Sequence, residues 1–170
     1  MSIISLSDED RVVGAAPAAD GLELVFVTQN AQLLHYPAAV VRTQGPGAGG
    51  VAGIKLAEGD SVIGFFSVAP ESSVVVTVSN PGSTLTGTDP GRAKISPLTE
   101  FPGKGRATGG VRAHGFLKGE IGLALAFVGE NPVAVASDGS PRELPIESGK
   151  RDGSGTPLAD VVSLIGEPLR

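Results

Sequence analysis

Residues 49–60 are GGVAGIKLAEGD, and residues 109–120 repeat the pattern as GGVRAHGFLKGE. The N-terminal segment 3–10, IISLSDED, matches the end of this motif, and GTPLADVV at residues 155–162 is a looser copy. Self-similarity of this kind indicates a chain built from repeats.

Three acidic residues mark the period of the repeat. Asp10, Asp60 and Glu120 close successive copies of the motif, 50 and then 60 residues apart. A period of this length is typical of four-stranded blades in propeller-like folds, with one blade for each repeat. The chain therefore holds about three repeats, and it begins and ends inside the shared motif.

Between the motifs lie three segments with a hairpin pattern, residues 24–34, 74–85 and 132–144. Each has an apolar strand, a turn rich in Asn, Asp, Gly or Ser, and a second strand. Asp138-Gly139 is the strongest of the turn signals. The sequence predicts an all-β chain.

The composition excludes several classes of protein. The chain has 170 residues, 41% of them hydrophobic, with Gly 25 and Pro 13 but no collagen period, so it folds with many turns. It contains no Cys, which removes disulfides and thiolate chemistry, and its two His are far apart in sequence, so no metal site is expected. We find no signal peptide pattern and no apolar run long enough to span a membrane.

The motif at residues 49–63 and the segment 99–112 resemble the repeat of the C-terminal domain shared by DNA gyrase A and the corresponding topoisomerase IV proteins. The resemblance covers nearly the whole chain and rests on three repeats in order. It implies a β-pinwheel, a propeller-like disc, here with about three four-stranded blades that exchange strands with their neighbours. It also implies that the outer rim binds DNA and bends it.

The resemblance also implies a single repeat domain over residues 1–170, with blades at roughly 7–57, 58–117 and 118–170. A disc of this family has about six blades, so three blades form a half-disc, a piece of a longer subunit or an open crescent. The Gly- and Pro-rich stretches at 45–50 and 102–110 are expected to be repeat junctions rather than flexible linkers.

In gyrase, DNA wrapping depends on a basic box, Gln-Arg-Arg-Gly-Gly-Lys-Gly. The nearest segment here is Gln44-Gly45-Pro46-Gly47-Ala48-Gly49-Gly50, which keeps the Gln and the glycines but has no basic residue. The other two junctions, at 104–110 and 150–156, keep two basic residues each. We therefore expect a degenerate box, similar either to those of topoisomerase IV-type proteins or to gyrase blades remote from the box.

Local charge indicates where DNA would bind, because Lys and Arg supply non-specific affinity by neutralising phosphates. The net charge of −5 is unfavourable overall, but residues 92–118 hold six of the 13 basic residues and a single acid, Glu100. That segment carries +5, which leaves −10 for the rest of the chain. The candidate DNA-binding residues are Arg92, Lys94, Lys104, Arg106, Arg112, Lys118, Lys150, Arg151, Arg42 and Lys55. The alternative is a solvated loop whose charged side chains only keep the junction exposed to solvent.

Other chemistry-bearing residues have structural interpretations. We expect Tyr36 to pack or to form a hydrogen bond at a strand end, and His114 to be either a strand residue or a phosphate contact. Asp8-Glu9-Asp10 is expected to be a solvated turn, because three consecutive acids on a strand do not face one point. No Walker loop or nucleophile elbow is present, so catalytic residues, cofactors and metals are all expected to be none.

The sequence thus favours a non-catalytic DNA-binding and DNA-bending module of a type IIA DNA topoisomerase, an isomerase. As the resemblance implies, its partners would be double-stranded DNA, the remainder of the gyrase A-type polypeptide and, through it, the ATPase partner protein. The place of action would be the bacterial cytoplasm at the nucleoid, away from membranes. The alternative is a propeller-like protein-interaction scaffold with little affinity for DNA.

Overall fold

A computed structural model describes residues 6–82 and 89–168. In that part of the chain the fold is all-β, with two short 3₁₀ helices, η1 (Ala38–Val40) and η2 (Leu98–Glu100). The strands are β1 (Glu23–Thr28), β2 (Gln32–Pro37), β3 (Val62–Val68), β4 (Val74–Asn80), β5 (Arg92–Pro97), β6 (Val111–Arg112), β7 (Gly122–Gly129), β8 (Val133–Val135), β9 (Pro141–Arg142), β10 (Thr156–Pro157) and β11 (Leu164–Gly166).

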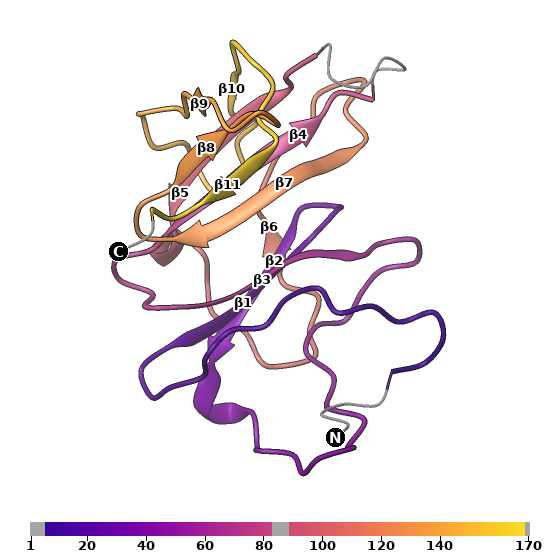
Figure 1. Cartoon of the computed structure of the whole chain (residues 1–170). Coiled ribbons are helices and arrows are strands. Elements are labelled where there is room, and N and C mark those ends of the chain that lie inside the picture. Colours follow the sequence, from indigo (N-terminus) through magenta and orange to yellow (C-terminus); the bar gives the residue numbers. More distant parts are fainter. Residues whose placement is uncertain (1–5, 83–88, 169–170) are drawn as a thin grey trace.

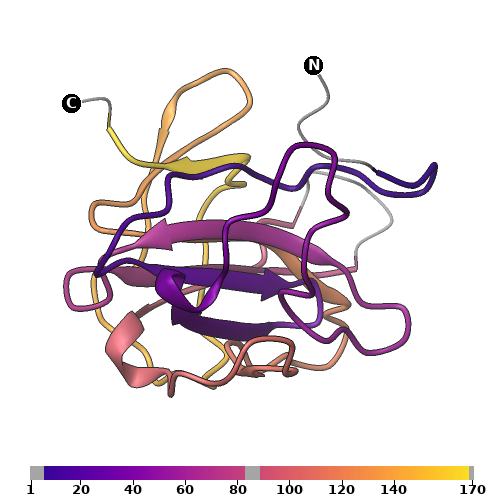
Figure 2. The ribbon, with the colours of Figure 1, turned by 90° about the horizontal axis from the view of Figure 1, so that it is seen from below.

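The strands form three antiparallel sheets. The first has the order β3-β1-β2-β6, the second β10-β5-β4-β7, and the third β11-β8-β9. Figure 1 shows the first sheet in the lower half of the molecule and the other two above it, and Figure 2 shows β1 to β3 running alongside one another. The prediction of an all-β, propeller-like fold is confirmed.

Each sheet is built around one hairpin, and the hairpin is completed by strands that come later in the chain. The hairpin β1–β2 pairs with β3 on one side and with β6, from the following repeat, on the other. The hairpin β4–β5 pairs in the same way with β7 and with β10. The predicted exchange of strands between blades is therefore present at two successive steps.

The hairpins turn at equivalent positions in the left-handed region. Ala31 has φ of 59°, Gly91 of 71° and Gly139 of 83°, each just before the returning strand. A residue in this conformation is the usual end of a short hairpin loop. The prediction of hairpins in the first and third repeats, with Asp138-Gly139 at the turn, is confirmed.

The second hairpin differs from the prediction. The expected return strand at Thr84-Leu85 lies outside the described residues, and β4 pairs instead with β5, which begins at Arg92. The loop is longer than the sequence indicated because Asn80-Pro81-Gly82, a strong turn signal, does not close this hairpin. Arg92 and Lys94 consequently lie on a strand.

The acids that set the sequence period close a turn. Backbone bonds run from Asp10 N to Ser7 O (3.0 Å), from Asp60 N to Ala57 O (3.1 Å) and from Glu120 N to Leu117 O (3.1 Å). The carboxylates then accept further bonds, that of Asp60 from the N–H of Asn30 at 3.0 Å and that of Glu120 from the hydroxyl of Ser79. Asp60 and Glu120 thus tie their turns to the preceding hairpin.

The second sheet is packed on both faces. Val25, Val27 and Leu33 of the first sheet meet Val75 of the second in one core, and Val76 and Val78 meet Ala134 and Ile165 of the third in another. A smaller cluster of Leu24, Leu34, Tyr36 and Ala38 lies on the outer face of the first sheet. The three sheets therefore stack in chain order, as blades do.

We predict that Gly110 is a position that does not tolerate a side chain. It has φ of 75°, and a Cβ there would lie 2.4 Å from the carbonyl oxygen of Leu33, at the point where β6 joins β2. Gly110→Ala should therefore cost more than the roughly 1–2 kcal/mol of left-handed strain alone. Denaturant titration should show the loss in free energy of unfolding.

Gly59→Ala is the matched control, because Gly59 has φ of 74° and a Cβ there would meet no described atom within 4 Å. Equal losses of stability in the two variants would contradict the close approach at Gly110.

Candidate nucleic-acid interface

The junctions between repeats lie in a row. We define the junction loops as residues 44–50, 104–110 and 149–155. Lys55 N donates to Thr108 O at 3.0 Å and Ala107 N donates to Gly53 O at 2.8 Å, so the second loop lies against the segment that follows the first. Gly115 N donates to Gly153 O at 3.0 Å, which repeats the contact for the third loop.

The second and third junction loops also bind the returning strand of the preceding hairpin. Lys104 N donates to His35 O at 3.1 Å, and Gly149 N donates to Ile95 O at 2.8 Å. The backbone then turns through Gly110 or Gly155, with φ of 75° and 70°, into β6 or β10. These two loops are thus anchored to the sheets by their backbone.

Two predicted DNA-binding arginines occupy equivalent places in this row. Arg106 Nη1 donates to Ala52 O at 2.7 Å, and Arg151 Nη1 donates to Arg112 O at 3.0 Å. Both guanidiniums therefore bind a carbonyl of the neighbouring repeat. A guanidinium has five N–H donors, so one such bond leaves donors for a ligand.

Arg92 is a more fully engaged clamp. Its Nε donates to Ser154 O at 3.1 Å and its Nη2 to Gly155 O at 2.7 Å, both in the third junction loop. The side chain is half-buried at the point where β10 joins β5. Its first role is therefore to hold the junction in place.

Lys94, a predicted DNA-binding residue, points inward and is not part of the candidate surface. It is 2% exposed, and its ammonium donates to Lys150 O (3.2 Å) and to Arg151 O. Burial lowers the pKa of Lys94 to about 8, although the carboxylates of Asp152 and Glu100 act in the opposite direction. The Lys94 ammonium therefore holds the third junction loop in place from the interior of the fold.

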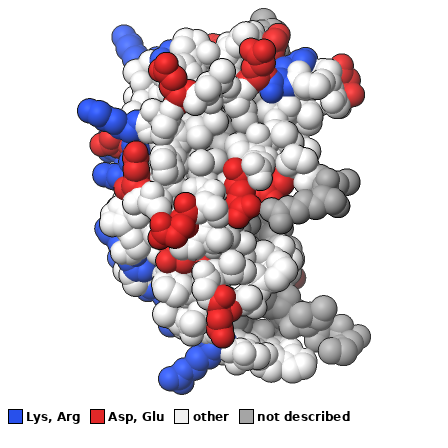
Figure 3. All heavy atoms as spheres, turned by 90° about the vertical axis from the view of Figure 1, so that its left-hand side faces the viewer, with Lys and Arg blue, Asp and Glu red and all other residues white. Residues whose placement is uncertain are grey.

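The remaining predicted cations reach the surface. Arg151 is half-buried, and the following are exposed: Arg42, Lys55, Lys104, Arg106, Arg112, Lys118 and Lys150. Figure 3 shows Lys and Arg side chains along one edge of the molecule from top to bottom, with carboxylates mainly on the adjoining face. The structure therefore separates most of the basic residues from the acids.

The degenerate box, residues 44–50, is an exposed loop with a turn from Ala48 N to Gly45 O at 3.2 Å. The side chain of Gln44 donates to Arg42 O at 3.5 Å. Glycine lets the backbone approach a ligand closely, but no cation stands within this loop.

Tyr36 and His35 are held inside the fold. Tyr36 is 2% exposed, donates to Gly53 O at 3.3 Å and stacks on Phe26. His35 contacts the Glu23 carboxylate through Nδ1, and its Nε2 lies 2.8 Å from Phe101 O. The His35–Glu23 pair was not anticipated from the sequence, since the two residues are 12 positions apart on different strands.

His114 is 1% exposed, so it offers no surface for phosphate contact. Its Nδ1 lies 2.9 Å from Thr77 Oγ1, and its ring stacks on Phe116. Burial lowers the pKa of His114 to about 4, with Lys94 acting in the same direction, so the ring is neutral at physiological pH.

Residues 8–10 are exposed, and Asp10 accepts hydrogen bonds from the N–H and hydroxyl of Ser7.

Among residues 6–82 and 89–168, no three His, Cys, Asp or Glu side chains gather where they could hold a metal ion. In the same residues no helix has the length and apolar character needed to cross a membrane.

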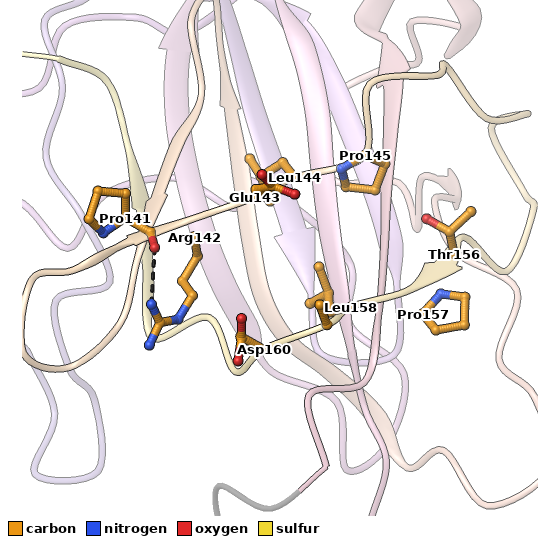
Figure 4. Close-up of a pocket in the computed structure, with 10 residues that line it drawn as sticks. Pro141, Arg142, Glu143, Leu144, Pro145, Thr156, Pro157, Leu158 and Asp160 are labelled. Atoms are coloured by element: carbon orange, nitrogen blue, oxygen red, sulfur yellow. Dashed lines mark hydrogen bonds between the residues drawn. The ribbon is translucent and has the colours of Figure 1, made fainter.

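A cavity of about 420 Å³ lies between residues 141–145 and 156–160. Figure 4 shows Arg142 and Asp160 at one end of it and Pro145 and Thr156 at the other. Arg142 Nη1 donates to Ser140 Oγ and to Pro141 O, but its buried Nε has no hydrogen-bond partner among the described residues. Arg142 was not among the candidate residues predicted from the sequence. Aligning β9 with β5 shows that Arg142 occupies the position of Lys94.

A profile described as "DNA gyrase C-terminal domain, beta-propeller" matches residues 1–19, 22–69 and 84–113, which is more than half of the chain. The chain belongs to the DNA gyrase C-terminal domain family. It is 33% identical over 122 residues to the topoisomerase protein TopoM of Mycolicibacterium smegmatis, and 31% identical over 108 residues to the DNA gyrase A protein of Escherichia coli K12. These alignments cover 71% and 64% of this chain.

Solved structures of the gyrase family show the same fold. The C-terminal domain of DNA topoisomerase IV has a TM-score of 0.76 at 23% identity and aligns with 93% of this chain. The C-terminal domain of DNA gyrase A has a TM-score of 0.74 at 18% identity and aligns with 96% of it. The three sheets are therefore blades of a β-pinwheel.

This gyrase-family chain spans only part of its relatives. It covers 48% of the topoisomerase IV domain and 56% of the gyrase A domain. It covers 16% of TopoM and 11% of the gyrase A protein from E. coli.

We predict that stability depends on pH through Lys94. The folded chain has a Lys94 pKa of about 8 and the unfolded chain 10.5, so the unfolded state binds more protons between these values. The cost of burying the charged ammonium is fully present below pH 8 and disappears as pH rises through 10.5. The free energy of unfolding, compared with that of Lys94→Met, should rise over this window.

Chemical denaturation at several pH values between about 7 and 11 measures both curves. Parallel curves for the chain and for Lys94→Met would contradict the inward, desolvated placement of the ammonium.

Proposed function

We propose that this chain is a DNA-binding and DNA-bending module of a type IIA DNA topoisomerase, with the row of junction loops as its contact surface. The observation that supports this most strongly is the contact between successive repeats at the junction loops, two of which carry exposed cations in a chain of net charge −5. Lys and Arg side chains follow one edge of the molecule (Figure 3). Membership of the DNA gyrase C-terminal domain family supports the same function.

The chemistry of the row suits a phosphate backbone. Lys104, Arg112, Lys118 and Lys150 are exposed cations on or beside the loops, where each could neutralise a phosphate and release counterions. The glycine-rich loops allow close approach of the backbone. Such contacts position a duplex without reading its bases, so binding would not depend on DNA sequence.

The curvature of the row would bend the duplex. Successive blades are rotated about the axis of a propeller-like disc, so a duplex in contact with several junction loops must curve around the rim. DNA cleavage and ATP hydrolysis would belong to the remainder of the gyrase A-type polypeptide and to an ATPase partner protein, both of which we propose as partners. The module itself would act without a catalytic residue.

A protein-interaction scaffold is the second candidate. The net charge of −5 and the absence of basic residues from the box at 44–50 favour it. The inward placement of Lys94 and the use of Arg92 as a clamp also reduce the charge available to DNA.

We predict that Arg112→Gln weakens DNA binding more than Arg11→Gln. Both side chains are exposed and both changes remove one positive charge, but Arg112 lies beside the junction loops and Arg11 belongs to the N-terminal segment. Loss of one phosphate contact should lower the slope of log Kd against log salt by about one. Fluorescence anisotropy with a short duplex at several salt concentrations measures this slope.

Equal effects of the two variants would place the binding surface elsewhere. Absence of binding by the unaltered chain at low salt would reject the DNA-binding function and leave the scaffold.

A further inference from the structure

The side chains behind the third junction loop are polar, whereas those at the equivalent places in the first sheet are apolar. Matching the registers of the hairpins and the two copies of the motif gives three equivalent pairs: Phe26 and Thr77, Leu34 and Lys94, Ile54 and His114. The first member of each pair packs in or against an apolar cluster, and the second is a buried polar residue. The second sheet therefore offers its junction loop hydrogen-bond partners that the first sheet lacks.

Carbonyl groups of the third junction loop consequently face inward. Ser96 Oγ donates to Gly149 O at 2.7 Å. The Lys94 ammonium donates to the next two carbonyl oxygens along the chain, those of Lys150 (3.2 Å) and Arg151. Three successive carbonyls of this loop are thus held by side chains of β5.

Two N–H groups of the same loop point outward as a result. The described peptide bonds are all trans, so the N–H that follows an inward carbonyl points in the opposite direction. The N–H groups that follow the carbonyls of Lys150 and Arg151 belong to Arg151 and Asp152, and neither donates to an atom of the described residues. Arg151 is half-buried and Asp152 is exposed. Consecutive N–H groups on the solvent side of a turn are suited to the oxygens of an anion.

The second junction loop has the opposite orientation at the equivalent peptide bond. Ala107 matches Asp152 in position, but its N–H donates inward to Gly53 O at 2.8 Å. Ala107 has φ of 63°, as a type II turn requires, whereas Asp152 lies outside the left-handed region. The hydrogen bond from Gly153 N to Lys150 O, 2.9 Å long, fits a type I turn. These turn types differ by a rotation of the central peptide of roughly half a turn.

The residue behind each turn accounts for this reversal. Leu34 has no donor, so the second turn directs an N–H inward, where it meets a carbonyl. Lys94 supplies a donor, so the third turn directs a carbonyl inward. In the first loop, Pro46 stands in the position of Arg151 and has no N–H to present. The outward pair is therefore a feature of the third junction loop.

Cations lie around the outward N–H groups. Lys150 is exposed, and the Arg151 guanidinium uses one donor on the carbonyl of Arg112, whose side chain is also exposed. Asp152 carries the one carboxylate of residues 149–155, and this carboxylate interacts electrostatically with Lys94. The second loop has two cations and no acid, so charge alone would make the second loop the better site for a phosphate.

We propose that Lys94 is a positioning residue for DNA, which turns the N–H groups of Arg151 and Asp152 toward one phosphate of the duplex backbone. The inference rests on the proposed DNA-binding function, and adds the main-chain donors of one contact and the buried side chain that orients them. Lys94 is 2% exposed and does not touch the duplex; it acts through the backbone of the loop. Donors held in place before binding need no ordering when the phosphate arrives.

Titration of the isotope-labelled full chain with inorganic phosphate, followed through the amide resonances, tests the N–H groups without DNA. We expect the signals of Arg151 and Asp152 to shift and that of Ala107 to stay, because its N–H is already bonded within the fold. Larger shifts in the second loop than in the third would show that charge alone decides, and would overturn the proposal.

The same titration with a short duplex separates this inference from the proposed function. We expect the duplex to shift the same two amide signals. Duplex binding without those shifts would overturn the inference and leave the proposed function intact. Absence of duplex binding at low salt would reject the proposed function, and the inference with it.

Lys94→Leu gives the second sheet the residue that the first sheet has, Leu34. The central peptide of the third turn should then reverse, with Asp152 N–H bound to Ala113 O, and the phosphate-induced shift of Asp152 should disappear. The duplex Kd should rise about tenfold, because a donor to a charged group is lost. The slope of log Kd against log salt should stay, because a neutral N–H releases no counterion.

Lys150→Gln is the matched variant for that slope. Lys150 is an exposed cation of the same loop, so its loss should lower the slope by about one. An equal fall of the slope in Lys94→Leu would mean that the Lys94 charge pairs with a phosphate directly, which would overturn the positioning role.

Lys94→Arg is the conservative variant. Its guanidinium keeps donors for the two inward carbonyls, and arginine occupies the equivalent position in the third sheet, Arg142. This variant should restore the amide shifts and the duplex Kd of the unaltered chain. Equal losses in Lys94→Arg and Lys94→Leu would overturn the positioning role, and the phosphate titration of the unaltered chain decides the question even where Lys94→Leu does not fold.

Discussion

The pairing of strand edges governs this fold. Each blade begins as a two-stranded hairpin, and the N–H and C=O groups on its outer edge need partners that the same repeat does not supply. The next repeat supplies them, through β6 to β2 and through β10 to β5. Gly110 and Gly155 permit the close approach at each exchange, since a side chain there would collide with a carbonyl of the receiving strand.

The basic residues stabilise this pairing of strands, in addition to any role in binding a ligand. Arg92, Arg106 and Arg151 donate to carbonyls of a neighbouring repeat, and Lys94 does so from a buried position. Charge-assisted bonds of this kind are stronger than neutral ones, so they hold the loops rigidly against the sheets. A surface that binds a stiff polymer benefits from loops whose positions are fixed beforehand.

Much of the fold could be predicted from the sequence because its repeats carry local signals. Asp10, Asp60 and Glu120 close short turns, and Asp138-Gly139 closes a hairpin, so their spacing gives the number of repeats. The predicted boundaries between blades, at residues 57 and 117, precede β3 and β7. Each of these strands pairs with the hairpin before it. No local feature of the sequence indicates that pairing. The inward turn of Lys94 was equally hidden, because a shift of one residue in register reverses the face of every side chain. For the remaining cations, the structure shows which of them are exposed, and their contact with DNA stays a prediction.

The exchange of strands sets the size of the unit by which such a chain can grow or shrink. Removing the stretch from β8 to β11 would take β10 away from the second sheet as well as deleting the third. A duplication that copied one hairpin without the junction that follows it would leave its neighbour with an unpaired edge. The unit of duplication is therefore a hairpin together with the loop and strand that complete the blade before it. Along the sequence, this unit is offset from the blade seen in the folded chain.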